Sequence, residues 1–173
     1  MSKTQENLMA AFAGESQARN KYTFWAKIAR KEGYLYIAKI FEETAANEMQ
    51  HAKDEFKMAG HIGTTAENLR AAMEGEDYEV TTMYPEFAEQ AKAEGNKEAE
   101  VLFRMIAKVE AHHRDRYKQL LEMVENGTAY KREKPIKWKC SKCGHIHEGK
   151  QPPGKCPVCK HGHEYFEPED VGF

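Results

Sequence analysis

The sequence predicts an all-α four-helix bundle followed by a small, separate C-terminal β/loop domain. Residues 1–126 contain one of the six prolines and no cysteine, whereas residues 127–173 contain five prolines, six of the twelve glycines and all four cysteines. Charge changes at the same place, since the first part carries 17 Lys and Arg against 22 Asp and Glu, or −5, and the second carries 9 against 6, or +3. We expect a bundle over 1–126, a linker over 127–137 and a small domain over 138–173.

Composition excludes several classes of protein. The 173 residues, 40% hydrophobic and 31% charged, suit one globular core with a small appendix. No apolar run approaches the roughly 18 residues of a membrane-spanning helix, and the uncharged segment Leu8–Gly14 has no basic region before it, as a signal peptide would. We therefore expect a cytoplasmic protein with no membrane partner. In such a protein, clustered cysteines are expected to bind metal rather than form disulfides.

Apolar residues at steps of three and four predict the helices of the bundle. Glycines follow the predicted helix ends, and Thr64 or Thr65 with Glu67 forms a capping box at the third start. The predicted helices run from about Lys3 to Arg30, Tyr34 to Ala59, Thr64 to Gly95 and Asn96 to Glu125. Four such helices joined by short turns predict a four-helix bundle.

Pro85 lies inside the third predicted helix. A proline there removes one backbone hydrogen bond and costs about 3 kcal/mol, so we expect a kink or a break. Thr81 and Thr82, one turn earlier, are placed to satisfy the carbonyl region that the proline frees.

Each predicted helix carries acid on its apolar face. One such residue is ordinarily peripheral or ion-paired, but a set without matching buried Lys or Arg would cost several kcal/mol for each uncompensated charge. Two divalent cations would offset five carboxylates to about −1. The residues of the set are Glu15, Glu48, His51, Glu76, Glu79, Glu110 and His113.

The spacing within the set supports metal binding. Residues i and i+3 share a helix face, so Glu48 with His51, and Glu110 with His113, each direct a carboxylate and an imidazole to one point. Carboxylates with imidazoles suit iron or manganese better than zinc alone. Two Glu-x-x-His motifs with a Glu from each of two other helices form the known ligand pattern of di-iron carboxylate bundles.

The tail contains two Cys-x-x-Cys knuckles, Cys140–Cys143 and Cys156–Cys159, separated by twelve residues. This spacing is typical of one tetrahedral thiolate site, and the 36 residues from Trp138 on cannot bury enough apolar surface to fold without a metal. Four thiolates accept either zinc or iron. Because the cysteines complete the site, we expect surface positions for His145, His147, His161 and His163, and also for His112 in the bundle.

Several motifs together resemble those of the rubrerythrins. They are Gly14–Asn20, Glu48–His51, Gly75–Glu79, Met83–Ala88, Glu110–His113 and the two knuckles. The resemblance covers essentially the whole chain and implies a ferritin-like di-iron bundle followed by a rubredoxin-like domain. One difference is His145, where rubredoxin-like domains commonly have tyrosine.

The resemblance also implies roles for the site residues. The di-iron ligands would be the seven residues above, with Glu48 and Glu110 bridging the metals, and one iron would move between His51 when reduced and Glu79 when oxidised. Tyr22 and Tyr84 match tyrosines that lie beside the metal ligands in the family. A third iron would be bound as Fe(Cys)4 by Cys140, Cys143, Cys156 and Cys159.

The implied activity is that of a peroxidase that reduces hydrogen peroxide to water in oxidative-stress defence. Electrons would pass through the Fe(Cys)4 centre from an external donor, such as a rubredoxin or an NAD(P)H-dependent reductase. The fourth helix runs 13 residues from His113 to Asn126, about 20 Å, before the linker begins. The resemblance favours a head-to-tail homodimer in which one tail faces the partner's bundle, with basic linker residues steering it towards the acidic body.

Two other functions stay open. A ferroxidase or iron-handling ferritin-like protein would share the bundle but has no use for a thiolate relay. A zinc-ribbon module would use the basic linker on nucleic acid, but the body is acidic and the tail domain has few aromatic residues. We therefore expect no nucleic-acid partner.

Overall fold

The computed structural model describes residues 2–170, so the outer limits of the predicted domains, residues 1 and 173, lie outside the described part. The chain divides into two compact units, Met1–Gly63 and Thr64–Phe173. No helix among the described residues is both long and apolar enough to span a membrane.

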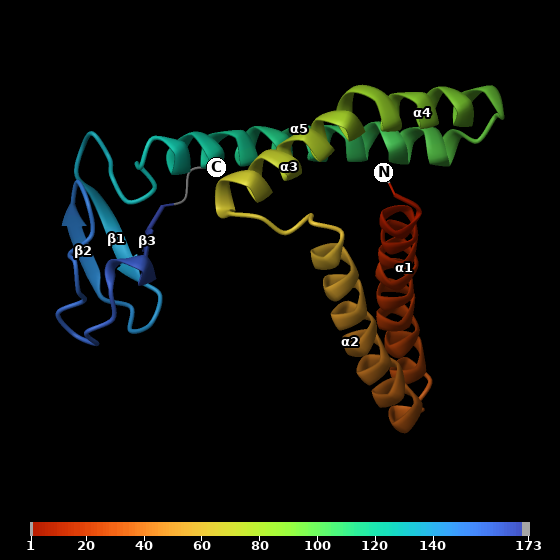
Figure 1. Cartoon of the computed structure of the whole chain (residues 1–173), viewed down its shortest axis with the longest axis horizontal. Coiled ribbons are helices and arrows are strands. Elements are labelled where there is room, and N and C mark those ends of the chain that lie inside the picture. Colours follow the sequence, from red (N-terminus) through yellow and green to blue (C-terminus); the bar gives the residue numbers. More distant parts are fainter. Residues whose placement is uncertain (1, 171–173) are drawn as a thin grey trace. The chain divides into compact units, whose positions relative to one another are not determined.

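The first unit is a helical hairpin of α1 (Lys3–Lys31) and α2 (Leu35–Met58), which lie side by side (Figure 1). These bounds confirm the first two predicted helices to within a residue at each end. Gly33, with a φ of 88°, permits the tight turn between them. The buried residues of the hairpin are alanines, whose small side chains allow close helix packing: Ala26, Ala29, Ala38, Ala45 and Ala52.

In the second unit, α3 (Thr65–Tyr78) and α4 (Tyr84–Ala93) pack along α5 (Lys97–Glu125) (Figure 1). The start of α3 has the predicted capping box, since the Thr64 side chain accepts from the Glu67 N–H and the Glu67 carboxylate accepts from the Thr64 N–H. The Asn96 side chain caps α5 by accepting from the Ala99 N–H at 3.1 Å.

The third predicted helix is interrupted before Pro85 rather than at it. A π-helical turn, η1 (Glu79–Met83), separates α3 from α4, and the Tyr84 N–H bonds to the Glu79 carbonyl five residues back. Pro85 then falls in the first turn of α4, the helical position that proline tolerates best. The Thr81 hydroxyl donates to the Asp77 carbonyl at 2.7 Å, four residues earlier, not to a carbonyl beside the proline.

The tail forms a three-stranded antiparallel sheet in the order β2-β1-β3. Its strands are β1 (Ile136–Cys140), β2 (Ile146–Gly149) and β3 (Phe166–Pro168), with a short 3₁₀ helix, η2 (His163–Tyr165), before β3. The first strand begins two residues before the predicted domain limit at Trp138. Trp138 pairs with His147 on one side and with Pro168 on the other.

The core of the tail is small and includes the metal-binding thiols. Trp138, Cys140, Cys156 and Phe166 are all buried, and the Trp138 indole N–H donates to the Gly149 carbonyl at 2.9 Å. Two of the four cysteines are therefore core residues, as expected of a domain that a metal must organise.

The two knuckles have the same backbone turn. The Gly144 N–H bonds to the Cys140 carbonyl at 2.8 Å, and the Lys160 N–H bonds to the Cys156 carbonyl at 3.0 Å. Both residues have a left-handed backbone conformation, with φ of 77° at Gly144 and 64° at Lys160. Glycine adopts this conformation freely, whereas a side chain there is strained, so the second knuckle contains a lysine where glycine would fit better.

We expect Lys160→Gly to stabilise the tail domain by about 1 kcal/mol, because it relieves the left-handed strain. The reverse change in the first knuckle, Gly144→Ala, should destabilise it by about 1–2 kcal/mol. The measurement is the guanidinium midpoint at which the thiolate–iron absorbance is lost. Equal midpoints for Lys160→Gly and the wild type would show that the second turn carries no strain.

Candidate metal centres

A carboxylate–imidazole cluster lies in the first unit. Glu15 comes from α1, and Glu48 and His51 come from α2; one ligand atom from each lies within 4.8 Å of the others. The His51 Nδ1 is 2.9 Å from the Glu48 Oε2, as the i, i+3 spacing predicts. The helical hairpin therefore brings together three oxygen and nitrogen donors.

The second unit contains a matching cluster. Glu76 comes from α3, and Glu110 and His113 come from α5, with ligand atoms again within 4.8 Å of one another. The His113 Nδ1 is 2.6 Å from the Glu110 Oε2 and 3.8 Å from the Glu76 Oε1. Each unit thus provides one Glu from one helix and a Glu-x-x-His pair from another.

Like charges crowd each cluster. Burial raises the pKa of Glu15, and the hydrogen bond to Glu48 and the charges of Glu48 and Glu55 raise it further. Burial likewise raises the pKa of Glu76, together with its hydrogen bond to Glu110 and the Glu110 charge. Two carboxyl groups can share a hydrogen bond only if one holds a proton. A divalent cation would replace that proton and relieve the repulsion.

Glu79 lies close to the second cluster without belonging to the set of ligand atoms that converge there. It is the first residue of η1. Burial and the charge of Glu110 raise the pKa of Glu79. The π-helical turn therefore positions an additional carboxylate beside Glu110, and such turns are frequent at functional sites.

The two tyrosines differ in their surroundings. Burial and the charges of Glu79, Glu110 and Glu76 raise the pKa of Tyr84, so this phenol lies beside the second cluster and keeps its proton at neutral pH. Tyr22 instead lies among aromatic rings, 5.6 Å from the centroid of Trp25 and 6.1 Å from that of Phe41.

Glu55 is an acidic residue that the predicted ligand set omits. Its Oε2 is buried and has no hydrogen-bond partner within residues 2–170, and its charge raises the pKa of Glu15. The sequence contained a signal, because Glu55 follows Glu48 by one heptad on the same face of α2.

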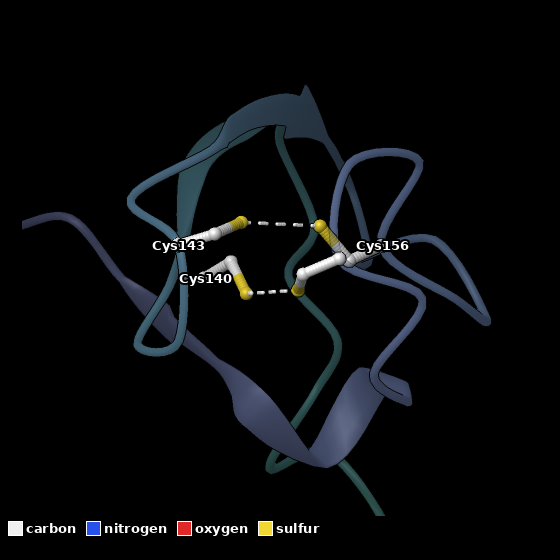
Figure 2. Close-up of side chains that lie close together, drawn as sticks. Cys140, Cys143 and Cys156 are labelled. Atoms are coloured by element: carbon white, nitrogen blue, oxygen red, sulfur yellow. Dashed lines mark hydrogen bonds between the residues drawn. The ribbon is translucent and has the colours of Figure 1, made fainter.

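The four cysteine sulfurs converge in the tail. The Sγ atoms of Cys143 and Cys156 are 3.6 Å apart, and those of Cys140 and Cys159 are 3.7 Å apart (Figure 2). All four lie within 4.8 Å of one another, and all are free thiols. This arrangement fits a tetrahedral thiolate site for one ion.

The surroundings of Cys156 and Cys143 shift the pKa values of the two thiols in opposite directions. Burial would raise the pKa of Cys156, but the N–H groups of Cys159 and Val158 donate to its sulfur and lower the pKa to about 6. At Cys143 the N–H of His145 lowers the pKa, whereas burial and the three neighbouring sulfurs raise it, to about 12 overall. Without a cation, four thiols this close together cannot all lose their protons, because the resulting thiolates repel one another.

The tail histidines interact with other groups. His161 stacks edge-on against Tyr165 at 4.8 Å, and His163 against Tyr130 at 5.0 Å. The carbonyls of His145 and His161 accept from the N–H groups of Cys140 and Cys156, each at 2.8 Å. Within residues 2–170 the tail's converging set of ligand atoms consists of cysteines alone.

Helical carboxylate–imidazole clusters joined to a four-cysteine domain are the donor sets of a di-iron carboxylate protein with an attached thiolate-metal domain. Comparison with known families agrees. The family model Rubrerythrin matches residues 6–121, and the model Rubrerythrin, rubredoxin-like domain, matches residues 138–167.

Individual relatives extend over almost the whole chain. A rubrerythrin of Porphyromonas gingivalis is 51% identical, covering 99% of this chain and 92% of its own length. A rubrerythrin of Nitratidesulfovibrio vulgaris is 41% identical, covering 96% and 94%. A solved structure of partially reduced nigerythrin is 33% identical, covering 97% of this chain and 87% of that one, with a TM-score of 0.38.

The chain belongs to the rubrerythrin family. It combines a ferritin-like helical domain with a C-terminal rubredoxin-like domain. Its cofactors are two non-haem irons in the carboxylate–histidine site and one iron bound by the four cysteines.

We expect Glu110→Gln to stabilise the metal-free protein more at pH 7 than at about pH 4.5. The raised pKa values of Glu76 and Glu79 mean that the folded state holds protons that the unfolded state releases. The free energy of unfolding therefore falls as pH rises from about 4.5 through the raised values. Removing the Glu110 charge lessens this loss.

The measurement is the urea midpoint of chelator-treated protein by circular dichroism. Glu122→Gln, an exposed change on the same helix, is the control. An effect of Glu110→Gln that is independent of pH, or matched by the control, would contradict the account.

Proposed function

We propose that this chain is a non-haem di-iron peroxidase that reduces hydrogen peroxide to water, with electrons relayed through its Fe(Cys)4 centre. The observation that supports this most is the presence of both donor sets in one chain. A carboxylate–imidazole site is suited to reaction with oxidants, and a thiolate iron is suited to one-electron transfer. We place this activity in oxidative-stress defence in the cytoplasm.

We propose that the two clusters together provide the ligands of the iron pair. The central carboxylate of each cluster contacts both other members, since Glu48 bonds to Glu15 and His51, and Glu110 bonds to Glu76 and His113. These contacts support Glu48 and Glu110 as the bridging ligands. The complete proposed set is Glu15, Glu48, His51, Glu76, Glu79, Glu110 and His113.

The iron pair would supply the two electrons that, with two protons, convert hydrogen peroxide to two waters. The residues beside it would manage charge and protons. Glu79, with its pKa raised by burial and by Glu110, is suited to hold either a proton or a cation. Tyr84 keeps its phenolic proton beside Glu79 and can donate a hydrogen bond.

Electrons would reach the Fe(Cys)4 centre from an external donor, such as a rubredoxin or an NAD(P)H-dependent reductase. We propose a head-to-tail homodimer in which the tail of one chain serves the bundle of the other. The opposite net charges of residues 1–126 and 127–173, −5 and +3, support this pairing. The proposed bundle, linker and tail have the limits 1–126, 127–137 and 138–173, and the linker range ends with the first two residues of β1.

A ferroxidase is the second candidate, because the same carboxylate clusters would bind and oxidise ferrous iron. Aerobic incubation with excess ferrous iron separates the two functions. A ferroxidase accumulates ferric mineral over many turnovers, whereas the peroxidase keeps a fixed iron content.

Iron-loaded protein should contain about three irons per chain. Replacing Cys143 and Cys159 with serine should remove about one iron and its thiolate charge-transfer absorption while leaving the other two. Metal analysis with Mössbauer spectroscopy measures both populations. A loss of all iron from this variant would contradict independent sites.

Peroxide should reoxidise the reduced protein much faster than air does, and Glu79→Ala should slow peroxide turnover by about 10-fold or more. The removed carboxylate lies beside Glu110 and is not needed for the helices to pack. Stopped-flow absorbance measures reoxidation, with Glu74→Ala, a change on α3 outside the ligand set, as the matched control. Equal rates with peroxide and air would contradict the peroxidase.

A further inference from the structure

We propose that Trp25, acting through Tyr22, is a one-electron donor to the metal site, and that it supplies the missing electron when hydrogen peroxide meets an iron pair that is only half reduced. We call Tyr22, Trp25 and Phe41 the aromatic trio. The proposal rests on the proposed function in one respect, namely that the iron pair reduces peroxide with electrons that arrive singly.

A supply of single electrons leaves the reduction of peroxide open to an incomplete reaction. Converting one hydrogen peroxide to two waters takes two electrons and two protons, whereas a thiolate iron passes on one electron at a time. An iron pair that holds only one available electron therefore needs a second electron from elsewhere. Without that electron, cleavage of the O–O bond releases hydroxyl radical, which damages the surrounding side chains.

The aromatic trio lies next to the first cluster on both helices of the hairpin. Tyr22 follows Glu15 by one heptad on α1, and Phe41 precedes Glu48 by one heptad on α2. Residues one heptad apart share a helix face and are about 10 Å apart along the axis. Because the chain direction reverses between α1 and α2, both rings are displaced from the cluster in the same direction, and their centroids are 6.1 Å apart.

Trp25 extends the trio by one further turn of α1. The i, i+3 spacing places its ring on the same face as that of Tyr22. The centroid of Trp25 is 5.6 Å from that of Tyr22 and 5.9 Å from that of Phe41, with an interplanar angle of 65° to Phe41. The trio is therefore a continuous ring contact that begins beside the cluster and ends at Trp25.

Trp25 is suited to lose an electron because its proton can leave with it. An indole that has lost an electron is far more acidic than a neutral indole and releases its N–H proton. Trp25 is 47% exposed, and its N–H has no hydrogen-bond partner within residues 2–170, so water can accept the proton. The other tryptophan, Trp138, is fully buried, and its N–H is bonded to the Gly149 carbonyl.

The second cluster has no equivalent path in the described part of the chain. The ring contacts of its tyrosine, Tyr84, are with Phe87 at 6.5 Å and Phe103 at 6.2 Å. Phenyl rings are much harder to oxidise than phenol or indole rings, so an oxidised Tyr84 could not pass its charge outwards. Only the first unit combines an oxidisable ring near the cluster with a second one at the surface.

Electrons, protons and atoms balance in the proposed reaction. Peroxide takes one electron from the half-reduced iron pair and one from Trp25, together with the indole proton and one proton from solvent, and becomes two waters. Tyr22 relays the electron and returns to its starting state. The iron pair ends ferric, and Trp25 ends as a neutral indolyl radical that a small thiol in solution reduces by hydrogen-atom transfer.

The test counts electrons in the full-length, iron-loaded protein. When fully reduced, each chain holds three electrons for peroxide, two in the iron pair and one in the thiolate iron. One equivalent of peroxide takes two electrons and should leave no protein radical. Two equivalents take four, so the protein must supply the fourth. Freeze-quench electron paramagnetic resonance should then show a tryptophan radical, and peptide mass spectrometry after exposure to air should find oxygen added to Trp25.

Variants assign the path. Tyr22→Phe should lower the yield of oxidised Trp25 severalfold, because the relay loses its oxidisable ring but keeps an aromatic side chain for packing. Trp25→Phe should replace the tryptophan radical with a tyrosyl radical at Tyr22. Tyr36→Phe is the matched control, since Tyr36 is 76% exposed on α2 and has no ring contact among the described residues. This change should alter neither the radical nor the oxidation of Trp25.

Four outcomes would overturn the proposal. Iron that is reoxidised by two equivalents of peroxide with neither a radical nor added oxygen at Trp25 would support the peroxidase but exclude Trp25 as a donor. Equal oxidation of Trp25 and Tyr36, or of Trp25 in chelator-treated protein, would mean that oxidants in solution attack exposed rings. An unchanged yield in Tyr22→Phe would exclude the relay. Iron that peroxide does not reoxidise would overturn the proposed function together with this inference.

Discussion

Repulsion among carboxylates is the interaction that the helical part of this protein has to resolve. Glu15 with Glu48, and Glu76 with Glu110, are close enough to share hydrogen bonds, and burial raises the pKa of one member of each pair. A helix face of this kind is stable only with protons or cations between the acids. Cation binding would therefore stabilise the folded helices as well as supply the chemistry.

Repulsion between like charges also acts in the tail, where the ligands are thiolates. Its buried residues are few, and two of them are cysteines that would repel each other as thiolates. Backbone N–H groups at Cys156 stabilise one thiolate, while the neighbouring sulfurs hold Cys143 as a thiol until a metal binds. In both domains the ligands bring groups of like charge close together, so bound metals would contribute directly to stability.

Sequence periodicity located the helices, except for the break within the third, and residue spacing located both motif types. The Glu-x-x-His pairs could be predicted because i, i+3 geometry depends only on the helix, and the Thr64 cap could be predicted because its partner Glu67 is local. The π-helical turn at Glu79 could not, since Pro85 indicated a defect but not that the defect would move one turn earlier. The strain at Lys160 was also invisible, because a left-handed φ belongs to the backbone of the folded knuckle.

The central claim is that the carboxylate–imidazole clusters hold a pair of irons. Anomalous diffraction at the iron edge, from crystals of the iron-loaded protein, tests it most directly. The account predicts two iron peaks about 3.5–4 Å apart, in contact with the carboxylates of Glu48 and Glu110, and a third among the four cysteines. A single peak at the cysteines, with the helical carboxylates free of metal, would contradict it.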